Sequence, residues 1–144
     1  MKSTWLLTLI LPLITSCAGT NTTVMTALGA APYMDEVVCH DRDCDIYWER
    51  SQIWIVNHCH WRIQLSTDSV IMTYGQGSDQ NYAFTVTKEP QTDGGYMIYL
   101  EPSHGSWAFG TSPNAKDVKR AFYYYIEHGV DLLADVRGLG PGLK

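Results

Sequence analysis

Residues 82–100 read YAFTVTKEPQTDGGYMIYL, and this stretch decides the fold. Large apolar side chains at Tyr82, Phe84 and Val86 alternate with small or polar residues, a period of two that is typical of a strand with one buried face. The same alternation returns at positions 96, 98 and 100 and stops at Pro102. Between the two runs, residues 91–95 contain Asp-Gly and Gly-Gly, which adopt positive φ at low cost. The stretch therefore predicts two antiparallel strands joined by a turn.

The segment before this pair continues the alternating pattern. Trp61, Ile63 and Leu65 are separated by polar residues, and the alternation resumes at positions 70, 72 and 74. We expect either one long strand with a bulge or two strands joined by a tight turn at Thr67–Asp68. With the pair above, the simplest arrangement is an antiparallel meander.

A helix is expected on each side of these strands. In residues 43–58, Ile46, Ile53 and Trp54 share one helical face, with Asp43 or Asp45 as the N-cap. The run at 53–56 also has strand propensity, which leaves a strand open as the alternative.

The second helix begins after Ser112–Pro113, an N-cap followed by proline at the first helical position. It ends at Gly129, and residues 130–136 allow a short further helix. We expect Tyr125 in the core and its two tyrosine neighbours partly exposed. The apolar stripe is formed by Ala115, Val118, Ala121, Phe122, Tyr125 and Ile126.

These elements predict an α+β fold, a two-layer sandwich in which an N-terminal and a C-terminal helix flank an antiparallel sheet of three to four strands. The chain of 144 residues is long enough for a single domain, which we place at 35–137, with a flexible tail at 138–144. Its formal net charge of −5 provides no basic surface, so nucleic acid is not an expected partner.

The N-terminus predicts export. One basic residue is followed by a ten-residue apolar stretch at 5–14, which is too short to span a bilayer and has the length of a signal-peptide core. We therefore expect a signal peptide at 1–16. The small, mostly uncharged residues that follow are expected to form a flexible tether, up to residue 34.

Residues 14–17, Ile-Thr-Ser-Cys, resemble the lipobox of bacterial lipoproteins, with Ile in place of the more usual Leu. The resemblance implies that Cys17 is lipidated and becomes the first residue of the mature chain. Several acyl chains hold a protein at a membrane where one would not. Ala18 implies the outer membrane, facing the periplasm. The strands and the final helix also vaguely resemble those of small lipoproteins of Gram-negative bacteria.

Three further cysteines lie in the domain, and export implies an oxidising compartment. A helix over 43–58 would separate Cys44 from Cys59 by about 22 Å at 1.5 Å per residue. A disulfide needs Cα atoms within about 7 Å, so Cys39–Cys44 is the expected pair and Cys59 is left over and buried. If the segment were a strand in a hairpin, Cys44–Cys59 would be possible instead.

The alternative for the same region is a metal site. Six potential nitrogen or sulfur ligands fall within 22 residues: Cys39, His40, Cys44, His58, Cys59 and His60. The C-x-x-C and H-x-x-x-H spacings typical of zinc sites are missing, so we favour a disulfide and ordinary loop histidines.

The chain contains no recognisable catalytic motif, such as G-x-S-x-G or a Walker loop. His104 and Ser106 lie in a loop, and a solvated turn explains them better than a hydrolase site. We therefore expect a non-enzymatic accessory or binding module of the cell envelope, with the metal-binding protein as the alternative. The expected partners are the membrane, through the lipid on Cys17, and an envelope protein. Apart from that lipid, no cofactor is expected.

Overall fold

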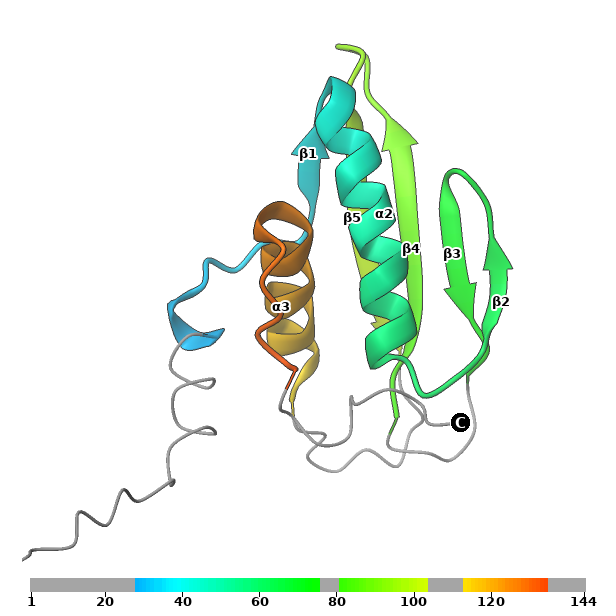
Figure 1. Ribbon diagram of the computed structural model, residues 1–144, viewed down its shortest axis with the longest axis vertical. Coiled ribbons are helices and arrows are strands. Elements are labelled where there is room, and N and C mark those ends of the chain that lie inside the picture. The colour runs from blue at the N-terminus through cyan, green and yellow to red at the C-terminus, as the bar shows by residue number, and fades with distance from the viewer. Residues whose placement is uncertain (1–27, 76–80, 104–112, 135–144) are drawn as a thin grey trace, which may run out of the picture.

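The computed structural model describes residues 28–75, 81–103 and 113–134, and Figure 1 shows the arrangement of the elements. In chain order they are β1 (Val37–Cys39), α2 (Asp41–His58), β2 (Ile63–Ser66), β3 (Val70–Thr73), β4 (Ala83–Pro90), β5 (Tyr96–Ser103) and α3 (Ala115–His128).

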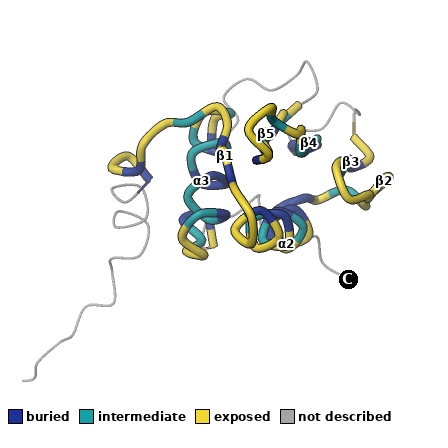
Figure 2. The backbone as a smooth tube through the Cα atoms, turned by 90° about the horizontal axis from the view of Figure 1, so that it is seen from above, coloured by how far each residue is buried: buried dark blue, intermediate teal, exposed yellow. Residues whose placement is uncertain are grey.

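All five strands belong to one antiparallel sheet, in the order β1-β5-β4-β3-β2. Both helices lie on the same face of this sheet (Figure 2), so the predicted two-layer α+β fold is confirmed. The strand count of three to four is wrong, because β1 was not expected. Its three residues are too few to display an alternation in the sequence, and it exists because Val37 and Cys39 pair with β5.

Between Trp61 and Tyr74 the chain forms two strands and a tight turn. The Thr67 amide donates to the Val70 carbonyl, and the Thr67 Oγ1 accepts from the Val70 amide at 2.9 Å. A bulge between Ile63 and Leu65 shifts the register, so that Ile63 pairs with Thr73 on the buried side while Leu65 pairs with Met72 on the other. The expectation that Ile63 and Leu65 share a face is therefore wrong.

Strand β5 continues through Pro102, where we expected it to end. Pro102 pairs with Phe84 of β4, and β1 pairs with β5 only as far as Ile98. The amide of Leu100 points away from β4, since it donates to the hydroxyl of Tyr123. The amide position of Pro102, two residues on, points the same way, so β5 loses no ladder hydrogen bond there.

Helix α2 buries Trp54, as expected, but not Ile46 and Ile53, which were expected on the same face. Its inward side contains Cys44, Trp48, Ser51, Trp54, Ile55 and His58, whereas Ile46 and Ile53 are exposed. The N-cap is His40, without a side-chain cap, instead of Asp43 or Asp45. Apolar residues lie on both sides of this helix, so periodicity alone could not identify the side that meets the sheet.

Helix α3 has Asn114 as its N-cap, whose Oδ1 accepts from the Asp117 amide at 3.0 Å. The expected cap, Ser112, lies outside the described residues. Gly129 ends the helix in the left-handed conformation with φ 72°, as expected. The sequence allowed a short further helix over residues 130–136, and residues 132–134 of this segment form a turn.

Tyr123 is fully buried in the core, whereas Tyr125 is only partly buried, which reverses our expectation for these two residues. The Tyr123 hydroxyl accepts from the Leu100 amide at 3.0 Å and donates to the Asp35 carbonyl. It thereby satisfies the backbone of β5 beyond the end of β1. Burial is the main cause that raises the pKa of Tyr123.

The folded part extends further towards the N-terminus than expected. Residues 28–30 are helical, and Leu28 and Ala31 are buried with the core. The tether expected at 17–34 is therefore wrong for its last residues, and a boundary at 35 is too late. Residues 1–27, which include the predicted signal peptide and Cys17, lie outside the described residues, as does the tail at 138–144.

Candidate functional site: a groove between α2 and β2

The three cysteines of the domain behave as predicted. Cys39 at the end of β1 and Cys44 in the first turns of α2 form a disulfide, with Cα atoms 5.0 Å apart. Cys59 is a free, buried thiol after the end of α2, and burial is the main cause that raises its pKa. The disulfide excludes both Cys39 and Cys44 as thiolate metal ligands in this state.

The structure does not bring the six potential ligands together. His40 lies at the start of α2 against Gly95, where a Cβ atom would be 2.6 Å from its ring. His58 and Cys59 lie at the opposite end of the same helix, and His60 packs edge-on against Trp61. In the described ranges, no group of three or more His, Cys, Asp or Glu side chains could hold a metal ion. His104 and Ser106, considered above for a hydrolase, lie outside those ranges.

His58 instead forms a partly buried side-chain pair with Asp131. Its Nε2 is 2.7 Å from Oδ2 of Asp131, and its ring lies 4.5 Å from that of Trp54. Burial alone would raise the pKa of Asp131, but the hydrogen bond and the charge of His58 oppose it, and the net pKa is lowered. The pair ties the end of α2 to the segment after α3.

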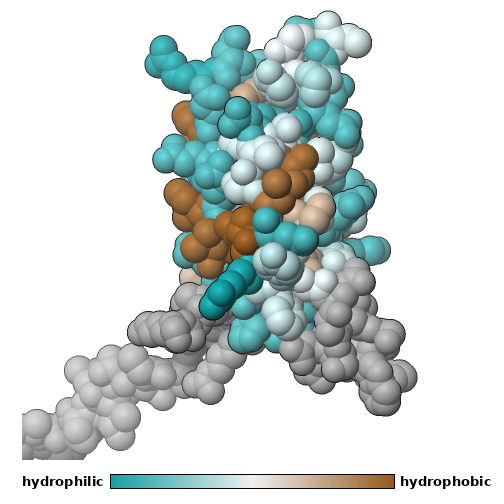
Figure 3. Space-filling model, turned by 90° about the vertical axis from the view of Figure 1, so that its right-hand side faces the viewer, coloured by the Kyte–Doolittle hydropathy of each residue, from teal (hydrophilic) through white to brown (hydrophobic). Residues whose placement is uncertain are grey.

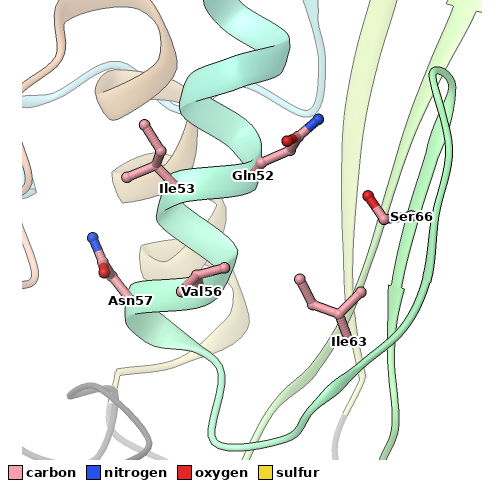
Figure 4. A pocket seen from close by; sticks show the side chains of 6 residues that line it. All are labelled: Gln52, Ile53, Val56, Asn57, Ile63 and Ser66. Atoms are coloured by element: carbon pink, nitrogen blue, oxygen red, sulfur yellow. The ribbon is translucent and has the colours of Figure 1, made fainter.

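An open groove lies on the other side of α2, between this helix and β2. It has a volume of about 300 Å³ and is lined by Gln52, Ile53, Val56 and Asn57 of α2 and by Ile63 and Ser66 of β2. In Figure 4, Val56 and Ile63 lie towards one end and Gln52 and Ser66 towards the other. An adjoining hollow of about 210 Å³ shares Val56 and Ile63 and extends to His60, Trp61 and Arg62.

The apolar side chains that line the groove are exposed. Val56 is 58% exposed, Ile53 43% and Ile63 38%. Apolar side chains gather on the side of the molecule where β2 forms the edge of the sheet (Figure 3). An exposed apolar patch of this kind, rimmed by polar groups, is typical of an interaction surface.

The bulge in β2 shapes this groove. Ile63 and Ser66 are three residues apart and both line it, which a regular strand would not allow because its side chains alternate. Leu65, between them, faces the other side of the sheet. The extra residue in the strand therefore places one apolar side chain on each face of the sheet edge.

The face of the sheet away from the helices is acidic around Tyr99. A hydrogen bond to Glu89 is the main cause that raises the pKa of Tyr99 to about 12, with further contributions from burial and from the charges of Glu89, Glu101 and Glu36. On the helix side, the Lys88 ammonium lies 5.0 Å from the Trp48 ring and 5.2 Å from the Tyr96 ring.

The sequence signal for this groove is the spacing of the apolar residues on the outer side of α2. Ile53 and Val56 are three residues apart and therefore lie on one face of a helix, away from Cys44, Trp48 and Ile55. Two apolar faces on one helix indicate two surfaces to cover, and only one of them is covered by the described part of the chain.

A comparison with protein-family models, curated proteins and solved structures found no match to this chain. None of the described helices has both the length and the apolar character needed to cross a membrane.

Proposed function

We propose that this protein is a lipoprotein of the cell envelope, held at the membrane by a lipid on Cys17, whose folded domain binds a partner protein through the groove between α2 and β2. The observation that carries the binding role is the exposure of Ile53, Val56 and Ile63 along one open groove. The anchoring is supported by the sequence of residues 14–17 and by the apolar stretch before it.

A protein fits this groove better than a charged small molecule. The six side chains that line it are apolar or uncharged, with amides at Gln52 and Asn57 and a hydroxyl at Ser66. Apolar contact with a few neutral hydrogen-bonding groups is the composition of a protein–protein interface core. The location favours a partner in the envelope, where the lipid would hold the domain.

Photo-crosslinking in intact cells tests the binding role. A photoreactive amino acid at Gln52 is expected to give a defined protein adduct that is lost when Val56 is changed to aspartate. The matched control is Val130→Asp, because Val130 is 51% exposed and does not line the groove. An adduct that persists in the Val56→Asp protein would contradict the proposal.

The anchoring has its own test. Labelled palmitate is expected to be incorporated into the protein in cells, and a Cys17→Ala variant is expected to lose both the label and the membrane association. If the variant still fractionates with the envelope as before, the lipid on Cys17 does not hold the protein there.

A further inference from the structure

Strand β2 is an edge strand. In the described part of the chain only β3 pairs with it, and all four of its residues are exposed. An edge strand presents unpaired amides and carbonyls, which can pair with a strand of another chain. The opposite edge, β1, has three residues, and its Cys39 is held in a disulfide.

The bulge gives β2 apolar surface on both faces. Ile63 is 38% exposed on the groove side and Leu65 is 44% exposed on the opposite side. A strand that paired with β2 would therefore cover apolar side chains above and below the new ladder. Burial of such surface is the main favourable contribution to association.

The two ends of β2 carry opposite charges. Arg62 immediately precedes the strand, and Asp68 follows it in the turn to β3. Glu49 lies on α2 one turn before Ile53, towards the end of the groove where Ser66 lies, because α2 and β2 run in opposite directions (Figure 1). Arg62, Asp68 and Glu49 are exposed, and none forms an ion pair with another described residue.

We propose that a second copy of this chain pairs with the first through β2, antiparallel and about a two-fold axis, so that the two five-stranded sheets become one continuous sheet. The two-fold brings Arg62 of each copy to Asp68 and Glu49 of the other. It also sets the two Leu65 side chains opposite each other on the face away from the helices, while each Ile63 lies near Thr67 of the other copy on the groove side.

The order of the charges along residues 62–68 favours a second copy of the chain as the partner and an antiparallel pairing of the two strands. Residues 62–68 begin with a basic residue, contain two apolar ones and end with an acidic one, which is the order that an antiparallel strand at this edge requires. A parallel arrangement would place like charges side by side, which is unfavourable. The contact is isologous, so it closes after two copies and does not propagate.

The proposed dimer rests on the proposed function in one respect, since attachment to a membrane raises the local concentration of both copies. A four-residue edge is a small contact, and confinement of this kind makes weak contacts effective. In the dimer the two grooves lie on either side of the contact between the two β2 strands, so that a partner would meet two copies of the binding surface.

Charge exchange tests the dimer directly. Analytical ultracentrifugation of residues 18–144 is expected to show reversible dimers, and Arg62→Asp or Asp68→Arg is each expected to weaken them roughly tenfold, because the two-fold repeats every charge contact. The variant with both exchanges is expected to regain most of the affinity. Arg42→Asp, an exposed change at the start of α2, is the control and should have no effect. A protein that stays monomeric up to about 1 mM, or a double variant no better than the single ones, would overturn the proposal.

A disulfide trap provides the measurement in cells. Leu65→Cys, at the two-fold axis of the proposed dimer, is expected to yield a disulfide-linked dimer on non-reducing gels, whereas Glu101→Cys on the open face of the sheet is not. Absence of the Leu65→Cys dimer would contradict the pairing. Loss of the dimer with an unchanged Gln52 adduct would contradict the dimer alone, and an intact dimer without that adduct would contradict the groove as a site for other proteins.

Discussion

Ile53 and Ile55 lie two residues apart on α2 and have opposite environments. Ile55 is fully buried in the core, beside Trp54, whose ring meets those of Phe84 in β4 and Phe122 in α3 at distances of 5.5 and 5.3 Å. Ile53 lines an open groove opposite β2. The helix thus separates a closed side, which holds the fold together, from an open side, which leaves apolar surface to be covered by something else.

The closed side is fastened by more than apolar contact. Nη1 of Arg50 donates to the carbonyls of Ile126 and Glu127 at 2.7 and 2.8 Å and so joins α2 to the last turn of α3. The Tyr123 hydroxyl and the His58–Asp131 pair add polar links on the same side. The open side has no comparable link between α2 and β2 among the described residues, which explains why the groove can remain open.

The largest expected effect comes from removing the same side chain on each side. Ile55→Ala is expected to lower the free energy of unfolding by about 2–5 kcal/mol, because it leaves a cavity in the core. Ile53→Ala, with the same change in helix propensity, should stay within about 0.5 kcal/mol. Urea denaturation of the two variants measures the difference, and equal losses would mean that the groove is closed in solution.

The disulfide fastens the beginning of α2 to β1 on the closed side. The Cys39→Ala/Cys44→Ala double variant is expected to lose about 2 kcal/mol, since the bridge closes only a short loop. Adding a reductant should destabilise the natural protein to about the same level and leave the double variant unchanged. A natural protein whose unfolding does not respond to reductant would show that the bridge contributes no stability.

Tyr123→Phe is expected to cost about 1–2 kcal/mol, because the buried Leu100 amide and the partly buried Asp35 carbonyl lose their hydrogen-bond partner. Tyr124→Phe, one position along the same helix and partly exposed, should change stability by less than about 0.5 kcal/mol. Thermal and urea unfolding of both proteins tests this, and a neutral Tyr123→Phe would mean that water satisfies the two backbone groups.

The smallest expected effect is a change in how stability depends on pH under acidic conditions. The pKa of Asp131 is lowered from its ordinary value of 3.8 in the folded protein, so the pair stabilises the fold above that value and the contribution is lost as the pH falls through the folded pKa. Asp131→Asn is expected to cost about 1 kcal/mol near neutral pH and to flatten the decline in stability below about pH 4. Unfolding curves at a series of pH values measure this, and parallel pH profiles for the two proteins would contradict the assignment.

Sequence patterns identified most elements but not their environment. The alternation at positions 82–100 and the stop at Gly129 predicted β4, β5 and the end of α3, because local chemistry decides them. The cysteine spacing predicted the Cys39–Cys44 bridge once α2 was taken as a helix. The same reasoning missed β1, misassigned part of the buried face of α2 and exchanged Tyr123 with Tyr125. Each of these errors concerns which neighbour a side chain meets.

Local sequence by itself determined the class of fold, the two helices and most of the strands, since period, turns and caps act over a few residues. Only the tertiary structure decided that β1 completes the sheet, that His58 pairs with Asp131 and that Val56 and Ile63 face each other across a groove. These features join residues far apart in the chain, and a single inserted residue in β2 changes which side chains share a face. No local pattern contains that information, because it arises from the packing of whole elements against one another.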